Sequence, residues 1–134
     1  FGQLDTAWHL IEGGAEAIAM HRDPTFPDGG IMRLGLGGIV AALESVTDIP
    51  ITTIGKPNAG FFQLALAKSG FDPEHTIMVG DSLEADIRGA RSVGLKTLFV
   101  RSGTNANAPT PVDSDWELPS IGALPKWYRE TFQS

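Results

Sequence analysis

Two short stretches of the chain combine residue types that could hold a phosphate group and a metal ion. The first is Gly55-Lys56-Pro57, and the second is Gly80-Asp81-Ser82, which is followed by Asp86. Each stretch follows a run typical of a β-strand, which is β-branched throughout at 51–54 and of the buried type at 76–79. In open parallel sheets, ligands bind beyond the carboxyl ends of the strands. A carboxylate at such an edge suits Mg2+, which takes one or two carboxylates and keeps water or phosphate oxygens as its other ligands.

The helix expected after Ser82 places Asp86 beside the face that packs on the core. At about 100° per residue, Ile87 lies on the same buried stripe as Leu83, and Asp86 lies about 60° from Leu83. An unpaired carboxylate in that position would be costly, so it should have a cationic partner. Lys56 is the best candidate. Either motif alone is often only a turn and a helix cap, but the two in this order, each at a strand exit, are more specific.

The order of the remaining elements predicts an α/β fold. We expect helices at 4–12, 39–46, 58–68, 82–93 and 124–132, and strands at 15–20, 51–54, 76–79, 97–100 and 116–121. Residues 21–33 and 102–114 are expected to be loops. Asn58 can cap the third helix, and Gly70 can end it. Strands that alternate with helices imply a parallel sheet with both faces covered.

Composition excludes several classes of protein. The chain has 134 residues, 42% of them hydrophobic, no cysteine, and a net charge of −6. This length is typical of one domain, and the lack of cysteine excludes a disulfide scaffold and a thiolate zinc site. The acidic balance argues against a nucleic-acid partner, and the apolar runs are too short for a membrane span. Because no signal peptide is visible, we expect a cytoplasmic protein.

Residues 56–104 resemble the C-terminal half of phosphatases of the haloacid dehalogenase (HAD) superfamily. The resemblance is to the subfamily with a large α/β cap, such as phosphoglycolate, p-nitrophenyl and phospholysine-phosphohistidine-pyrophosphate phosphatases. Residues 14–38 resemble the end of that cap. The resemblance therefore implies that residues 1–38 are the end of a cap domain with its return linker. It also implies that residues 39–134 are the C-terminal part of a Rossmann-like core domain.

The resemblance also implies roles for single residues in a Mg2+-dependent hydrolase of phosphate monoesters. Lys56 is similar to the family's third-motif lysine, which holds the nucleophile and the transferred phosphoryl group, and Lys56 and Asn58 are the candidate substrate-binding residues. Asp81 is similar to the metal ligand of the fourth motif. Asp86 is similar to that motif's second acid, so it is a candidate catalytic residue with Lys56 and a candidate metal ligand with Asp81. A small phosphorylated metabolite is the implied substrate.

The family's Asp-x-Asp motif, which supplies nucleophile and general acid, lies near the N-terminus of its members. The early part of this sequence lacks it, because Asp5 has no second Asp two residues on and no apolar strand before it. We therefore expect half of an active site, inactive alone and dependent on an upstream half or a partner chain. The sheet would also lack a central strand, and the open edge could lead to a homodimer. One alternative is a non-catalytic α/β module that acts through a partner. Another is a receiver-type phosphoacceptor domain, but receivers place their acids before the lysine, whereas here Lys56 precedes Asp81.

Overall fold

The computed structural model describes residues 1–110 and 112–133 and forms two compact units, Phe1–Gly55 and Lys56–Ser134. The domain boundary expected from the sequence lies between residues 38 and 39. The compact units instead divide after Gly55, because residues of the second helix and of the segment after it share a core with the first helix. Whether residues 39–55 belong to a cap or to a core domain stays a prediction.

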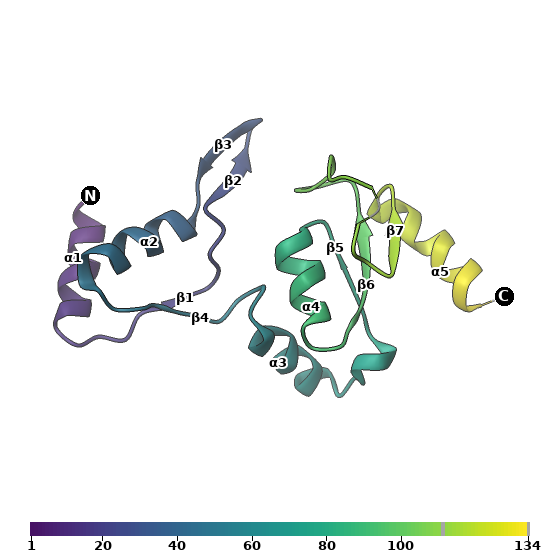
Figure 1. Cartoon of the computed structure of the whole chain (residues 1–134), viewed down its shortest axis with the longest axis horizontal. Coiled ribbons are helices and arrows are strands. Elements are labelled where there is room, and N and C mark those ends of the chain that lie inside the picture. The colour runs from purple at the N-terminus through teal and green to yellow at the C-terminus, as the bar shows by residue number, and fades with distance from the viewer. Residues whose placement is uncertain (111, 134) are drawn as a thin grey trace. The chain divides into compact units, whose positions relative to one another are not determined.

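The first unit consists of two helices, a short parallel strand pair and a hairpin (Figure 1). Its elements are α1 (Gly2–Glu12), β1 (Ile18–Ala19), β2 (Thr25–Asp28), β3 (Ile31–Leu34), α2 (Leu36–Thr47) and β4 (Thr52–Thr53). The strands expected at 15–20 and 51–54 are reduced to two paired residues each, Ile18 with Thr52 and Ala19 with Thr53. The core of the unit is formed by Ile11, Ala19, Val40 and Ile51.

The prediction of a loop at 21–33 is wrong, because β2 and β3 form an antiparallel hairpin there. Its turn is Gly29-Gly30, and both glycines have positive φ angles, 57° and 83°. Two left-handed residues in a two-residue turn give the twist that hairpin strands need, and glycine adopts that conformation without strain. Pro27 lies opposite Met32. Proline is tolerated because a two-stranded hairpin has only edge strands.

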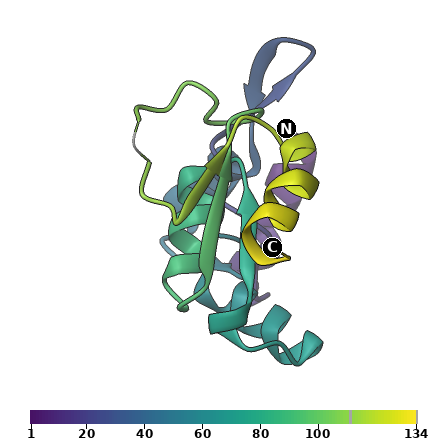
Figure 2. The same ribbon diagram turned by 90° about the vertical axis from the view of Figure 1, so that its right-hand side faces the viewer.

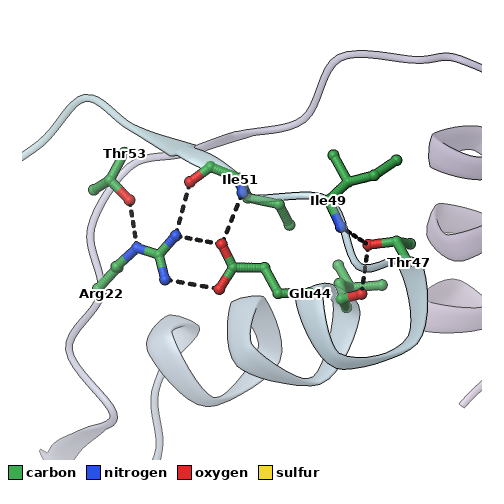
Figure 3. A network of polar contacts seen from close by, with 7 residues as sticks. Arg22, Glu44, Thr47, Ile49, Ile51 and Thr53 are labelled. Carbon is green, nitrogen blue, oxygen red and sulfur yellow. Dashed lines mark hydrogen bonds and ion pairs between the residues drawn. The ribbon is translucent and has the colours of Figure 1, made fainter.

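A polar network joins α2 to β4 and to the segment after β1 (Figure 3). The Arg22 guanidinium donates to both carboxylate oxygens of Glu44, at 2.9 and 2.6 Å, and to the Ile51 carbonyl at 2.7 Å. Its Nε donates to the Thr53 hydroxyl at 2.7 Å. Glu44 also accepts the Ile51 amide at 2.7 Å. The hydrogen bonds from Arg22 and then Ile51 lower the pKa of Glu44 to about 2.

The second unit contains a three-stranded parallel sheet with the strand order β5-β6-β7. Its elements are α3 (Ala59–Ser69), a 3-10 turn (Pro73–His75), β5 (Ile77–Gly80), a π-helical turn (Leu83–Arg88), α4 (Gly89–Arg91), β6 (Lys96–Val100), β7 (Trp116–Leu118), a second 3-10 turn (Ile121–Ala123) and α5 (Leu124–Phe132). The expected α/β class and parallel sheet are confirmed. The last strand ends at Leu118, earlier than expected, and the loop expected at 102–114 includes residue 111, which lies outside the described residues.

Helices cover both faces of this sheet, with α4 and α5 on opposite sides (Figure 2). One face packs against Phe62, Ala90 and Leu95, and Met78 of β5 points to this side. The other face carries Leu98, Val100 and Leu118, with Leu124 and Trp127 of α5 packed against them. Successive strand residues alternate between the two faces, as expected for a sheet buried on both sides. Within residues 1–110 and 112–133, every helix is too short or too polar to cross a bilayer.

Candidate active site

The structure brings Lys56 and Asp86 together, as the sequence predicts. Lys56 Nζ lies 2.7 Å from Asp86 Oδ1. The side chain of Asp86 is 4% exposed, whereas that of Lys56 is 39% exposed. The buried carboxylate therefore has its cation, and part of the lysine remains in contact with solvent. A lysine held in this way can direct its ammonium group toward an anionic ligand.

The second oxygen of Asp86 organises the turn after β5. Asp86 Oδ2 accepts the backbone amides of Asp81 at 3.2 Å and Ser82 at 3.1 Å. Gly80 makes this approach possible, because a side chain there would overlap the Asp86 carboxylate. Asp86 thus links the lysine to the backbone that carries Asp81.

A π-helical turn explains the depth at which Asp86 lies. Regular helical spacing predicts Asp86 at the edge of the buried stripe, but Ala85, Asp86 and Ile87 are all buried. The Ser82 carbonyl accepts the amides of both Asp86 and Ile87, and the Ser82 hydroxyl caps the turn through the Ala85 amide. The wider turn lets three consecutive side chains face the interior. Such turns are frequent at functional sites.

Lys56 is positioned by the start of α3. Asn58 Oδ1 accepts the Gly60 amide at 2.8 Å, so this side chain caps the helix as predicted. Gly89 lets the segment lie close to α4, because an added Cβ would come 3.0 Å from Pro57 Cα and 2.7 Å from the ring of Phe62. The substrate-binding role expected for Asn58 stays a prediction.

Asp81 is half-buried at the carboxyl end of β5, where the segment after β6 closes on it. The Thr104 amide donates to Asp81 Oδ2, and the Asn105 amide donates to the Asp81 carbonyl at 3.1 Å. Asn105 Oδ1 accepts the Leu83 amide at 2.9 Å. The Thr104 amide lowers the pKa of Asp81, burial opposes this, and the charge of Lys56 adds to the lowering. The carboxylate is therefore kept ionised.

The contribution of Thr104 and Asn105 was missed by the sequence analysis, which treats their segment only as a surface loop. The order of the strands nevertheless indicates that this segment lies near Asp81. Because β5 and β6 are parallel, the segment that leaves β6 must begin at the same sheet edge as Asp81. Gly103 adds a second signal, since a side chain there would overlap the Asp81 carboxylate.

The donor set fits a metal that takes only part of its ligands from this chain. Asp81 supplies an ionised carboxylate at the sheet edge, whereas both oxygens of Asp86 already accept hydrogen bonds from Lys56 and from two backbone amides. Among the described residues, no group of three or more His, Cys, Asp or Glu side chains could form a complete protein cage. Mg2+ suits such a site, because it usually binds one or two carboxylates and keeps several waters.

Comparisons with known proteins relate the chain to hydrolases. A family model described as HAD-hydrolase-like matches residues 53–121. Haloacid dehalogenase-like hydrolase domain-containing protein 2 of Bos taurus is 38% identical over 100 residues, which cover 75% of this chain and 39% of that protein. Dihydroxyacetone phosphatase of Corynebacterium glutamicum is 35% identical over 108 residues, which cover 81% of this chain and 39% of that protein.

A solved structure agrees with these relatives. Glycerol phosphate phosphatase of Mycobacterium tuberculosis, in complex with magnesium, superposes with a TM-score of 0.70 at 34% identity. The superposition covers 84% of this chain and 35% of that protein chain. This chain spans about two-fifths of the length of the curated relatives described above.

Proposed function

The chain belongs to the HAD-hydrolase-like family, and on that basis we propose that it supplies the lysine and metal-ligand half of a Mg2+-dependent phosphate monoester hydrolase. The observation that carries the proposal is the arrangement at the end of β5, where Asp86 joins Lys56 to the backbone of Asp81. A relative named dihydroxyacetone phosphatase and a similar structure named glycerol phosphate phosphatase support a small phosphorylated metabolite as the substrate.

In this proposal, Lys56 binds the phosphoryl group and Asp86 orients the lysine. When a phosphoryl group is transferred, negative charge is spread over its oxygens, and fixed cations stabilise that charge. The Lys56 ammonium is partly exposed and is held at 2.7 Å by a buried carboxylate. This combination supports direct contact of the lysine with substrate and a positioning role for Asp86.

Asp81 is the proposed ligand of Mg2+. A bound Mg2+ would neutralise charge on the phosphoryl oxygens and help to orient the substrate. The half-buried Asp81 carboxylate is ionised and fixed by the Thr104 amide, which supports this role. Water and phosphate oxygens would supply other ligands. Asp86 would contribute indirectly, because it holds the backbone on which Asp81 lies.

A further segment or chain would supply the nucleophile and an additional strand. Among the described residues, β5 pairs only with β6, so its other edge is open. This open edge lies beside Asp81 and supports the docking of a strand from an upstream segment or from a partner chain. A strand that ends there could bring a nucleophilic carboxylate to the same sheet edge. Alternatively, a second copy of this chain could pair with the same edge and form a homodimer.

Phosphate release from p-nitrophenyl phosphate with MgCl2 tests the proposal. We expect no release by the chain alone above that of its Asp81→Asn variant, and turnover once a segment with the missing strands is added. In that assembly, Lys56→Met should lower kcat by about 100-fold or more, because a charge-stabilising group is lost. Lys68→Met, at an exposed lysine of α3, is the matched control. Hydrolysis by the chain alone that depends on Asp81 would contradict the proposal.

A further inference from the structure

The segment 102–110, which follows β6, fixes both the side chain and the backbone of Asp81. Its Thr104 amide donates to Asp81 Oδ2, and its Asn105 amide donates to the Asp81 carbonyl. Asn105 Oδ1 accepts the Leu83 amide and so holds the first residue of the π-helical turn. The orientation of Asp81 therefore depends on where this segment lies.

Arg101 directly precedes this segment, and its side chain binds the segment's C-terminal part. Its Nη1 donates to the carbonyls of Ala108 at 2.7 Å and Ala106 at 3.3 Å, and its Nη2 donates to the Thr110 hydroxyl at 2.9 Å. Its Nε pairs with the carboxylate of Glu117 in β7. The guanidinium is a planar fork with several donors, so one side chain can make these contacts at once. Its side chain is only 20% exposed.

We propose that Arg101 is a positioning residue for Asp81, and that it acts through segment 102–110 to hold the carboxylate ready for Mg2+. The inference rests on the proposed function, because it takes Asp81 as the Mg2+ ligand. A ligand that is already held by hydrogen bonds needs less ordering when the ion binds. Loss of contacts that orient a metal ligand typically lowers metal affinity by about 10- to 100-fold.

The charge of Arg101 and its hydrogen bonds have opposite effects on Mg2+ binding. A nearby cation repels Mg2+, so the loss of charge alone would strengthen binding. The loss of the hydrogen bonds to Ala106, Ala108 and Thr110 releases the segment and with it Asp81, which weakens binding. The direction of the change therefore separates a positioning role from a purely electrostatic one.

The test is hydrogen exchange, read by mass spectrometry, of the full chain at micromolar concentration during a titration with MgCl2. In the wild-type chain, residues 80–84 should gain protection as Mg2+ rises. Arg101→Met should raise the half-saturating Mg2+ concentration by about 10-fold or more. Arg101→Lys keeps the charge but loses the planar fork, and it should shift the titration in the same direction. Unchanged exchange of residues 59–69 would show that the fold is retained.

Two further variants make the result decisive. Arg88→Met removes a cation from the exposed pair with Glu84 on the π-helical turn, and should leave the half-saturating concentration unchanged or lower it. Thr110→Val removes one contact and should give a smaller increase even if Arg101→Met unfolds the chain. If the half-saturating Mg2+ concentration is the same in the wild type and all variants, or is lower in Arg101→Met, the positioning role of Arg101 is wrong. The proposal that Asp81 binds Mg2+ would still hold. No Mg2+ response in the wild-type chain would overturn the magnesium proposal and this inference with it.

Discussion

Asp86 is the residue on which most of the site's internal geometry depends. One of its oxygens holds Lys56, and the other holds the backbone amides of Asp81 and Ser82. Because the carboxylate is buried, each of these hydrogen bonds forms with little competition from water. Removal of its charge should therefore loosen the lysine and the turn together.

A double-mutant cycle between Lys56 and Asp86 measures this coupling. Asp86→Asn should lower the free energy of unfolding by about 1.5–3 kcal/mol, the range for a hydrogen bond to a charged group. Lys56→Met should cost less in the Asp86→Asn background, with a coupling energy of about 1 kcal/mol or more. Urea unfolding of the four chains gives these values. The exposed pair Glu84–Arg88 is the control cycle and should couple by less than about 0.5 kcal/mol. Equal coupling in both cycles would contradict the central role of Asp86.

Glu44 in the first unit should make stability depend on pH. Its folded-state pKa is about 2, below the ordinary value of 4.5, because the carboxylate accepts hydrogen bonds from Arg22 and from the Ile51 amide. The ionised form therefore stabilises the fold above about pH 4.5, and this contribution is lost as the pH falls toward 2.

Thermal melting at pH 6 and pH 3 should show this contribution. The melting temperature of the wild-type chain should fall more between these two values than that of Glu44→Gln, which has already lost the carboxylate. Glu16→Gln removes a charge from an exposed residue and should keep the wild-type difference. An equal fall in Glu44→Gln and wild type would show that the network with Arg22 does not stabilise the fold.

The sequence is sufficient to pair Lys56 with Asp86, whereas for Asp81 it indicates only which segment lies nearby and not the individual contacts. A carboxylate beside a buried stripe must have a cation, and the chain offers one lysine at a neighbouring strand exit. The hydrogen bonds from Thr104 and Asn105 come from backbone and side-chain groups of an irregular segment. No periodicity or charge pattern encodes the path of such a segment.

At the scale of elements, local signals predict helix ends well and turn geometry less well. Asn58 and Gly70 begin and end α3 as expected, and α5 spans the expected residues 124–132. The hairpin was missed because the prolines, glycines and charged residues of 21–33 together favour a loop, although the Gly29-Gly30 pair also favours a two-residue turn. The π-helical turn was missed because ordinary helical spacing assumes a constant angle per residue.

A substitution at Gly89 tests whether α3 and α4 must lie close together to position Lys56. Gly89→Ala should lower the free energy of unfolding, because the new methyl would meet Pro57 and the buried Phe62 ring. Overpacking of this kind costs about 1–3 kcal/mol, against a gain of at most about 1 kcal/mol in helix propensity. Denaturant unfolding measures the change. Gly122→Ala, whose methyl would make only an ordinary contact 3.5 Å from Ser120, is the control. A neutral Gly89→Ala would show that α3 can shift freely.

At the scale of the whole molecule, the open edge of β5 connects the fold to the proposed function. In the described part of the chain, β5 is an edge strand although it lies next to the site. Its residues Ile77 and Val79 pack with the core beneath α5. An edge strand that is apolar and unprotected by charge is a template for pairing with another chain.

We therefore expect the isolated chain to associate as its concentration rises, through pairing at the β5 edge. Sedimentation velocity from micromolar to near-millimolar concentration should show dimers or larger species at the upper end. Residues 77–80 should then gain protection from hydrogen exchange, because an added strand covers their free backbone groups. Addition of the segment that restores turnover should suppress the association, since both would occupy the same edge. If the chain stays monomeric at every concentration and melts in one sharp transition, the β5 edge needs no partner. The proposal that a docked strand completes the active site would then have to be abandoned.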